Sequence, residues 1–426
     1  MARSSSANSK PAIAALAFTW TLERRLSMIY RTFGRTGLQM PVFSCGGMRY
    51  QQSWSDMPLA DVEKENQRNL EATIRRALEL GITHIETARG YGSSERQLGV
   101  ILPTLPREEL IVQTKIAPEA DPAVFEKHFE ESLDRLNLDY VDLLAIHGIN
   151  NHELLWQSVR PGGCLSIARR LQSAGKARHI GFSTHAAMPT ILDAIGHQGD
   201  GGFDYVNLHW YYINQTNWPA IELAHEHDLG VFIISPNDKG GMLYRPTDKL
   251  TELCAPLHPI VFNTLFCLAR PEVHTLSLGA ARPSDFDLQV SSLPMIEQAS
   301  STIAPIVERL DQAMQQAVGA DVATRFAEGL PDWEESPGYM SMAIMLWLRN
   351  LAKAYDMVEY GQMRYNLLGN GGHWFEGLNA KNLESISDEQ FNKAVKDSPF
   401  AQHVRDWLAE THKLLGGSEL KRLSQS

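Results

Sequence analysis

The sequence has little cysteine and no long apolar run. Its 426 residues include four cysteines, and no two of them form a CxxC pair. That number and spacing do not support a disulfide framework or a zinc site, and they fit a reducing, cytoplasmic location. The longest apolar run, around 342–348, ends at Arg349, far short of the roughly 20 residues that cross a bilayer. We therefore expect a soluble protein without a membrane span.

The sequence also lacks clustered positive charge. It has 39 Lys+Arg against 50 Asp+Glu, a net charge of −11, and no long block of basic residues. Proteins that bind nucleic acids draw much of their affinity from neutralising phosphates, so we expect no nucleic-acid partner. The contents of 43% hydrophobic and 21% charged residues are ordinary for a folded chain. Because 426 residues exceed what one core usually serves, we expect a large domain with a substantial addition.

From Val42 onward, short β-branched segments alternate with longer segments of helical period. Residues 62–80 and 123–136 are two such helices, because each keeps one apolar face. An open doubly wound sheet would usually stop at about five or six strands, and no GxGxxG motif follows the first strand. The pattern therefore predicts an α/β fold, a parallel (β/α)8 TIM barrel. The expected strands are 42–47, 83–88, 110–115, 141–148, 179–184, 205–210, 230–235 and 274–280.

After Gln289 the pattern becomes helical only. We expect one helix over 303–318, one or two over 340–363 with a buried core at 340–348, and an amphipathic pair over 388–415. The predicted organisation is a barrel over 28–290 and an all-helical C-terminal extension over 291–426. Residues 1–27 begin Ser-rich, and we expect them to form a disordered N-terminal extension.

The expected active site lies at the C-terminal ends of the barrel strands. Glu86, Lys115 and His147 end successive predicted strands, and Tyr91 follows Glu86 in the adjoining loop. A carbonyl reductase needs a proton donor for the developing alkoxide, and a tyrosine serves if a nearby ammonium favours its phenolate. Lys115 would supply that charge, Glu86 would hold Lys115, and His147 would orient the substrate carbonyl.

These segments resemble the aldo-keto reductase family. The resemblance is carried by residues 33–49, 82–99, 110–115, 141–148, 175–185 and 277–286, and it extends from Tyr30 to about Gln289. It implies NAD(P)H-dependent reduction of an aldehyde or ketone by a tetrad of Asp, Tyr, Lys and His. The matching residues here are Glu86, Tyr91, Lys115 and His147, so Glu stands where the family has Asp.

The resemblance also implies where a nicotinamide coenzyme would bind. Arg282 is the only cation in the segment expected at the adenosine 2′-phosphate, where Asp285 and Asp287 would repel a phosphate. The resemblance favours NADPH as the coenzyme and does not exclude NADH. Arg282 could equally be a solvated surface charge. The coenzyme residues would be Gly47 and Met48 at the ribose, Ser183, Thr184 and Asn207 at the carboxamide, Ser235 and Asn237 at the pyrophosphate, and Gly279, Ala281, Arg282 and Asp285 at the 2′-phosphate.

The helical extension resembles that of one branch of the family, in which several members carry a ferredoxin-like cysteine cluster. No cysteine follows Cys267, so the ligand count excludes an iron–sulfur cluster there. Segment 363–377 would either close the substrate pocket, with His373, Trp374 and Phe375 shaping specificity, or be a structural loop anchored by Trp374.

The sequence is also compatible with functions other than carbonyl reduction. The Glu86 departure and the large extension also fit an NAD(P)H-binding sensor or accessory subunit with weak turnover. A metal-dependent hydrolase is disfavoured, because the first strand offers only Cys45, Gly46 and Gly47, so we expect no metal. The sequence does not define which small carbonyl compound is the substrate, nor the oligomeric state.

Overall fold

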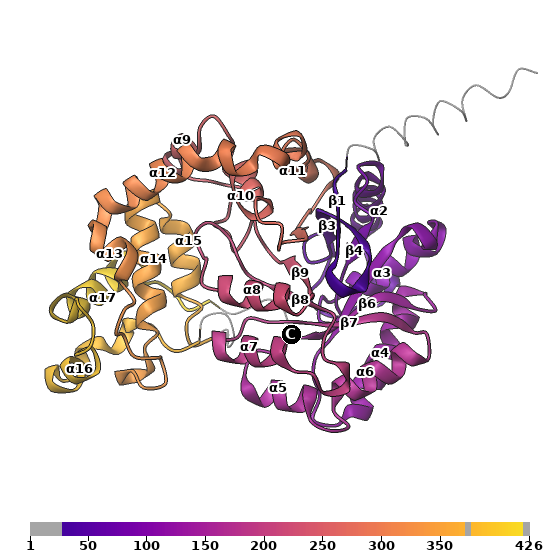
Figure 1. The fold of residues 1–426 in the computed structure, drawn as a ribbon, viewed down its shortest axis with the longest axis horizontal. Coiled ribbons are helices and arrows are strands. Elements are labelled where there is room, and N and C mark those ends of the chain that lie inside the picture. The colour runs from indigo at the N-terminus through magenta and orange to yellow at the C-terminus, as the bar shows by residue number, and fades with distance from the viewer. Residues whose placement is uncertain (1–27, 371–375, 421–426) are drawn as a thin grey trace, which may run out of the picture.

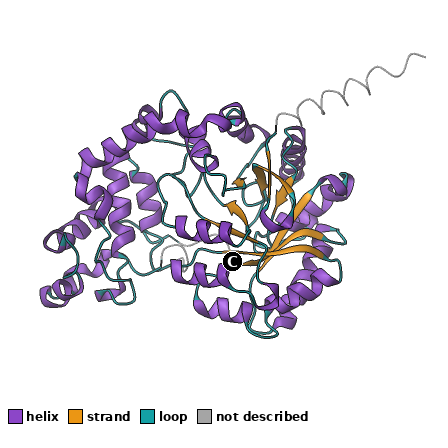
Figure 2. Cartoon of the chain, viewed as in Figure 1, coloured by secondary structure: helices purple, strands orange, loops and turns teal. Residues whose placement is uncertain are grey.

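The structure is a computed structural model that describes residues 28–370 and 376–420. The predicted N-terminal extension, and the predicted specificity residues His373, Trp374 and Phe375, lie outside the described residues. Eight parallel strands close into a barrel, in the order β10, β3, β4, β5, β6, β7, β8, β9. Helices surround this barrel, and further helices lie to one side of it (Figures 1 and 2). The predicted TIM barrel with additional C-terminal helices is thus confirmed.

Every predicted barrel strand is present, with ends that differ slightly from the predicted ones. The strands are almost entirely buried, which explains why they appear in the sequence as short apolar runs. The parallel register pairs Gly46 with Glu86 and His147 with Ser183, so the ends of neighbouring strands meet at one mouth. The strands are β3 (Phe43–Gly46), β4 (His84–Glu86), β5 (Ile111–Ile116), β6 (Val141–His147), β7 (Ala177–Ser183), β8 (Tyr205–Leu208), β9 (Gly230–Ile233) and β10 (Thr275–Leu278).

An antiparallel hairpin that was not predicted from the sequence precedes the barrel. Its strands β1 (Tyr30–Thr32) and β2 (Gln39–Pro41) have three residues each, too few for a periodic signal. Phe33, in the connection, is fully buried and clusters with Ile111 and Tyr205, the first residues of β5 and β8. The hairpin therefore covers the end of the barrel opposite the strand C-termini.

Helices of the barrel connect successive strands. The predicted helices at 62–80 and 123–136 are confirmed as α2 and α4, and α4 begins where the Asp121 side chain accepts from the Ala123 amide. The helices are α2 (Lys64–Glu79), α3 (Ser94–Ile101), α4 (Pro122–Leu136), α5 (His152–Val159), α6 (Cys164–Ser173), α7 (Met188–Gly196), α8 (Trp218–Glu226), α9 (Asp248–Cys254), α10 (Pro259–Leu268) and α11 (Asp287–Val290).

The C-terminal helices pack around α14, whose Met345 and Leu348 are fully buried, as the apolar run predicted. The predicted segment 340–363 divides into two helices at Asp356, which has a φ of 56°. Helix α12 packs on α9 and α10 and so attaches these helices to the barrel, while the boundary at residue 290 stays a prediction. No helix in the two described ranges is long and apolar enough to cross a membrane. The helices are α12 (Ala299–Val318), α13 (Ala320–Arg325), α14 (Met342–Tyr355), α15 (Val358–Tyr365), α16 (Asp388–Ala394) and α17 (Ala401–Leu415).

Candidate active site

The four predicted catalytic side chains lie together at the ends of β4, β5 and β6. The Lys115 ammonium donates to the Tyr91 hydroxyl over 3.1 Å and to the Thr87 carbonyl over 2.8 Å, and it contacts the Glu86 carboxylate. The Tyr91 hydroxyl also lies 3.4 Å from Glu86 Oε1. The ring of Tyr91 meets the ring of His147 edge to face, with 5.7 Å between centroids. All four side chains are buried.

The electrostatics of this group are dominated by burial. Burial lowers the pKa of Lys115 well below its ordinary value, since desolvation disfavours the ammonium form. An adjacent carboxylate favours the ammonium, and Glu86 is in that position. The Lys115 ammonium also lies 4.5 Å from the centre of the Tyr91 ring, a distance at which cation and ring attract. The phenol is therefore held among a cation, a carboxylate and an imidazole.

The loop after β3 packs against Tyr91 and the residues that follow it. Gly92 has a φ of 54°, and a Cβ at this position would lie 1.9 Å from the Ser53 carbonyl oxygen, so only glycine fits. That carbonyl accepts from the Ser93 amide over 3.0 Å, next to Tyr91. Trp54 follows and meets the Tyr91 ring edge to face, with 6.4 Å between centroids.

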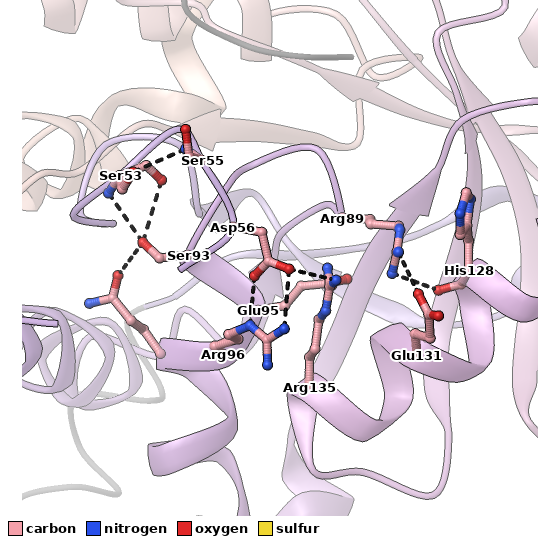
Figure 3. Close-up of polar contacts among 11 residues, drawn as sticks. Ser53, Ser55, Asp56, Arg89, Ser93, Glu95, Arg96, His128, Glu131 and Arg135 are labelled. Atoms are coloured by element: carbon pink, nitrogen blue, oxygen red, sulfur yellow. Dashed lines mark hydrogen bonds and ion pairs between the residues drawn. The ribbon is translucent and has the colours of Figure 1, made fainter. Parts of the chain in front are cut away.

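Asp56 anchors this loop to two helices (Figure 3). Its carboxylate accepts from Arg96 Nε of α3 over 2.6 Å and from Arg135 of α4 over 2.7 Å. The hydrogen bond from Arg96 is the main reason that the pKa of Asp56 is lowered. Trp54 and Asp56 are not predicted from the sequence, because no local pattern links a loop after β3 to the residues that follow β4.

The predicted carboxamide-binding residues differ in whether their side chains form hydrogen bonds within the described part of the protein. The Ser183 hydroxyl accepts from the Gly148 amide over 3.0 Å, and the Thr184 hydroxyl donates to the Ile149 carbonyl over 2.7 Å. Asn207 is fully buried, and neither its amide nitrogen nor its oxygen has a partner among the described residues. A buried amide without partners is unfavourable by about 1–3 kcal/mol. A ligand with its own amide, such as the carboxamide of nicotinamide, fits this side chain.

The two segments predicted at the pyrophosphate and the 2′-phosphate lie side by side. The buried Asn237 amide donates to the Tyr244 hydroxyl over 3.3 Å, and that hydroxyl donates to the Gly279 carbonyl over 3.0 Å. Arg49 also donates to this carbonyl, and its guanidinium stacks 4.2 Å from the centre of the Tyr244 ring. Arg49 is a second cation near Gly279 that was not predicted from the sequence, because it follows β3 and not β10.

The remaining predicted coenzyme residues fall at the same mouth. Arg282 donates to Asp285 over 3.1 Å and is largely exposed, and Asp285 also accepts from the Ala281 amide over 2.9 Å. The Asp285 carboxylate therefore accepts hydrogen bonds from residues of its own segment. A Cβ at Gly47 would lie 2.7 Å from the Glu86 carbonyl oxygen, so the backbone just after β3 passes close to the end of β4. Met48 is the next residue.

The chain is similar to known proteins over part of its length. The Aldo/keto reductase family model matches residues 43–252. The L-glyceraldehyde 3-phosphate reductase of Escherichia coli (strain K12) is 29% identical over 180 residues, covering 38% of this chain and 47% of that protein. The NADH-specific methylglyoxal reductase of the same organism is 34% identical over 135 residues, covering 26% of this chain and 39% of that protein.

A solved structure gives the same fold. The aldo-keto reductase from Klebsiella pneumoniae, in complex with NADPH, matches with a TM-score of 0.52 and 18% identity, covering 65% of this chain and 94% of that chain. In its barrel and in the sequence of that part, this chain is similar to members of the aldo-keto reductase family. The match spans 47% or less of the length of the two curated relatives.

Proposed function

We propose that the protein is an NAD(P)H-dependent oxidoreductase that reduces an aldehyde or ketone to an alcohol, with Tyr91 as the proton donor. The observation that carries this proposal is the buried 3.1 Å contact between the Lys115 ammonium and the Tyr91 hydroxyl. The family match supports it, and so do relatives that are named as reductases. One relative is named NADH-specific and the Klebsiella protein binds NADPH, so both coenzymes enter the test.

The coenzyme would lie across the mouth of the barrel, and when bound it supplies the hydride that adds to the carbonyl carbon. The unpartnered amide of Asn207 is the best fit to its carboxamide. Ser183 and Thr184 border that position. The other expected contacts are Gly47 and Met48 at the ribose, Ser235 and Asn237 at the pyrophosphate, and Gly279, Ala281, Arg282 and Asp285 at the adenosine end.

The proton steps follow from the four buried side chains. The Tyr91 hydroxyl gives its proton to the developing alkoxide, and the Lys115 ammonium stabilises the phenolate that is left. Glu86 balances the charge of Lys115, and its extra methylene relative to Asp does not prevent that contact. His147, against the Tyr91 ring, orients the carbonyl oxygen towards the phenol.

A parallel measurement of binding and turnover tests the proposal. Fluorescence titration with NADPH and NADH gives coenzyme affinity, and a panel of aldehydes gives turnover. Tyr91→Phe should lower kcat by at least about 100-fold with unchanged coenzyme affinity, since general acid catalysis contributes that much. Tyr140→Phe, on the outer surface beside Arg178, should behave as wild type.

Each other outcome has a definite meaning. Full activity of Tyr91→Phe would remove Tyr91 from the mechanism. Coenzyme binding without turnover of any aldehyde would favour the sensor or accessory subunit. Failure to bind either coenzyme would overturn the oxidoreductase proposal.

A further inference from the structure

A cavity of about 700 Å³ lies between the barrel mouth and the C-terminal part of the chain. His147 lines it from the barrel, so the cavity reaches the catalytic group. Pro118 and Leu154 also line it from the barrel, and a wall made of Trp333, Tyr339 and Leu378 lines it from the C-terminal part of the chain. A volume of this size suits an organic molecule much larger than a two- or three-carbon aldehyde.

The wall from the C-terminal part is made of large apolar side chains that are not buried by the protein. Tyr339 is 60% exposed and Leu378 is 42% exposed, although both face the cavity. Exposed apolar surface that lines a concave site is typical of a site for an apolar ligand.

The backbone holds Tyr339 in an unfavourable conformation. Tyr339 has a φ of 55°, which is rare for a bulky residue. Its carbonyl accepts from the Leu378 amide over 2.7 Å, and the next residue, Met340, forms a β-bridge with Leu378. Tyr339 and Leu378 are thus fixed to each other. Strain of this kind is kept where the position of a side chain matters for a ligand.

The charge of the cavity disfavours anions. Among the described lining residues there is no Lys or Arg, and the one carboxylate is Glu376. Glu376 is half-buried and accepts from the Trp333 indole over 3.2 Å, which places its charge on the apolar wall. A phosphate or carboxylate in this cavity would meet a like charge and find no cation among those residues.

We propose that the substrate is a neutral carbonyl compound with a bulky aromatic group, which packs against Trp333, Tyr339 and Leu378 while its carbonyl faces His147. This inference rests on the proposed function, because it assumes that Tyr91 and His147 act on the carbonyl. It assigns Trp333 and Tyr339 to substrate specificity and Glu376 to the rejection of anionic substrates.

Three aldehydes separate size from charge: benzaldehyde, 4-carboxybenzaldehyde and propanal. We expect kcat/KM to be at least about tenfold higher for benzaldehyde than for 4-carboxybenzaldehyde. Trp333→Ala and Tyr339→Ala should each lower kcat/KM for benzaldehyde about tenfold, mainly through KM, and leave propanal unchanged. Trp156→Ala is the matched control, because Trp156 is 62% exposed and outside the cavity lining.

Glu376→Gln tests the charge separately. It should raise kcat/KM for 4-carboxybenzaldehyde relative to that for benzaldehyde. A preference of the wild type for 4-carboxybenzaldehyde would overturn the inference. Unchanged benzaldehyde kinetics in both alanine variants would also overturn it.

A binding measurement distinguishes this inference from the proposed function. If no aldehyde is reduced, the proposed function fails. Calorimetry with benzyl alcohol then tests whether the cavity binds an aromatic ligand. Binding to the wild type that is weakened in Tyr339→Ala supports an aromatic ligand, and equal or absent binding overturns it.

Discussion

The ammonium of Lys115 lies 3.1 Å from the hydroxyl of Tyr91, and both side chains are almost completely buried. The Glu86 carboxylate contacts this ammonium and favours its charged form, since an unpaired buried charge is strongly destabilising. The same three residues therefore carry the proposed chemistry and affect the stability of the barrel. Both effects are accessible to measurement.

Glu86→Gln should lower both stability and activity. Removing one partner of a buried pair leaves the other charge uncompensated, at about 3–5 kcal/mol in the free energy of unfolding. Urea unfolding measures this loss, and Glu86→Asp, which keeps the charge, should lose less. Glu131→Gln breaks the partly exposed pair with Arg89 (Figure 3) and should change the unfolding free energy by less than about 1 kcal/mol. Equal unfolding free energies for Glu86→Gln and wild type would contradict a buried, charged pair.

Asn207→Leu should stabilise the free protein while weakening coenzyme binding. The substitution removes a buried amide that has no partner among the described residues, and it removes the proposed contact to the carboxamide. Thermal unfolding with and without NADPH measures both effects. The control is Asn263→Leu, because Asn263 is equally buried but bonds the Pro236 carbonyl over 2.9 Å, so this variant should be destabilised. A destabilised Asn207→Leu would mean that the amide is already satisfied.

Asp56→Asn should lower kcat/KM several-fold without changing coenzyme affinity. The carboxylate joins Arg96 and Arg135 (Figure 3). The loop that it anchors holds Trp54 against Tyr91. Because Asp56 lies on the surface, its loss should change the unfolding free energy by less than about 1 kcal/mol. Steady-state kinetics are compared with those of Glu65→Gln, a variant of the exposed pair with Arg68. Unchanged kinetics in Asp56→Asn would show that the anchor does not position Tyr91.

Arg282→Ala and Arg49→Ala distinguish the two cations at the expected adenosine end. If Arg282 binds the 2′-phosphate, its loss should weaken NADPH at least about tenfold and leave NADH unchanged, since a hydrogen bond to a charged group contributes about 1.5–3 kcal/mol. Arg49→Ala is measured in the same titration and shows whether the cation stacked on Tyr244 shares this role. Arg245→Ala, an exposed arginine paired with Glu359, is the control. An equal loss for both coenzymes would place the affected side chain away from the 2′-phosphate.

The free energy of unfolding should fall as the pH is lowered from about 6.5. Burial, followed by the charge of Lys115, lowers the pKa of His84 to about 3, whereas an unfolded histidine titrates near ~6.5. Between these values the unfolded chain binds the additional proton, so His84 contributes up to about 1.4 kcal/mol of lost stability for each pH unit. Urea unfolding at pH 7, 6 and 5 measures the slope. His84→Asn should give a shallower slope, and an unchanged slope would assign the acid sensitivity elsewhere.

Much of the barrel was predictable because its signals are local. A short apolar run followed by a helix of period 3.6 identifies each β/α unit, and both helices predicted in the barrel, at 62–80 and 123–136, were confirmed. The hairpin at β1 and β2 was missed because its strands are too short for such a signal. Arg49, Trp54 and Asp56 were missed for a different reason, since each acts on a residue from another strand end.

The sequence by itself determined the order of strands and helices, and with it the positions of Glu86, Tyr91, Lys115 and His147 at neighbouring strand ends. A parallel barrel leaves these ends no other place to meet. Only the tertiary structure decided what surrounds them. The unpartnered amide of Asn207, the anchor at Asp56 and the apolar wall at Trp333 and Tyr339 depend on contacts between segments distant in the chain. Such contacts are set by packing, which hydrophobic periodicity does not encode.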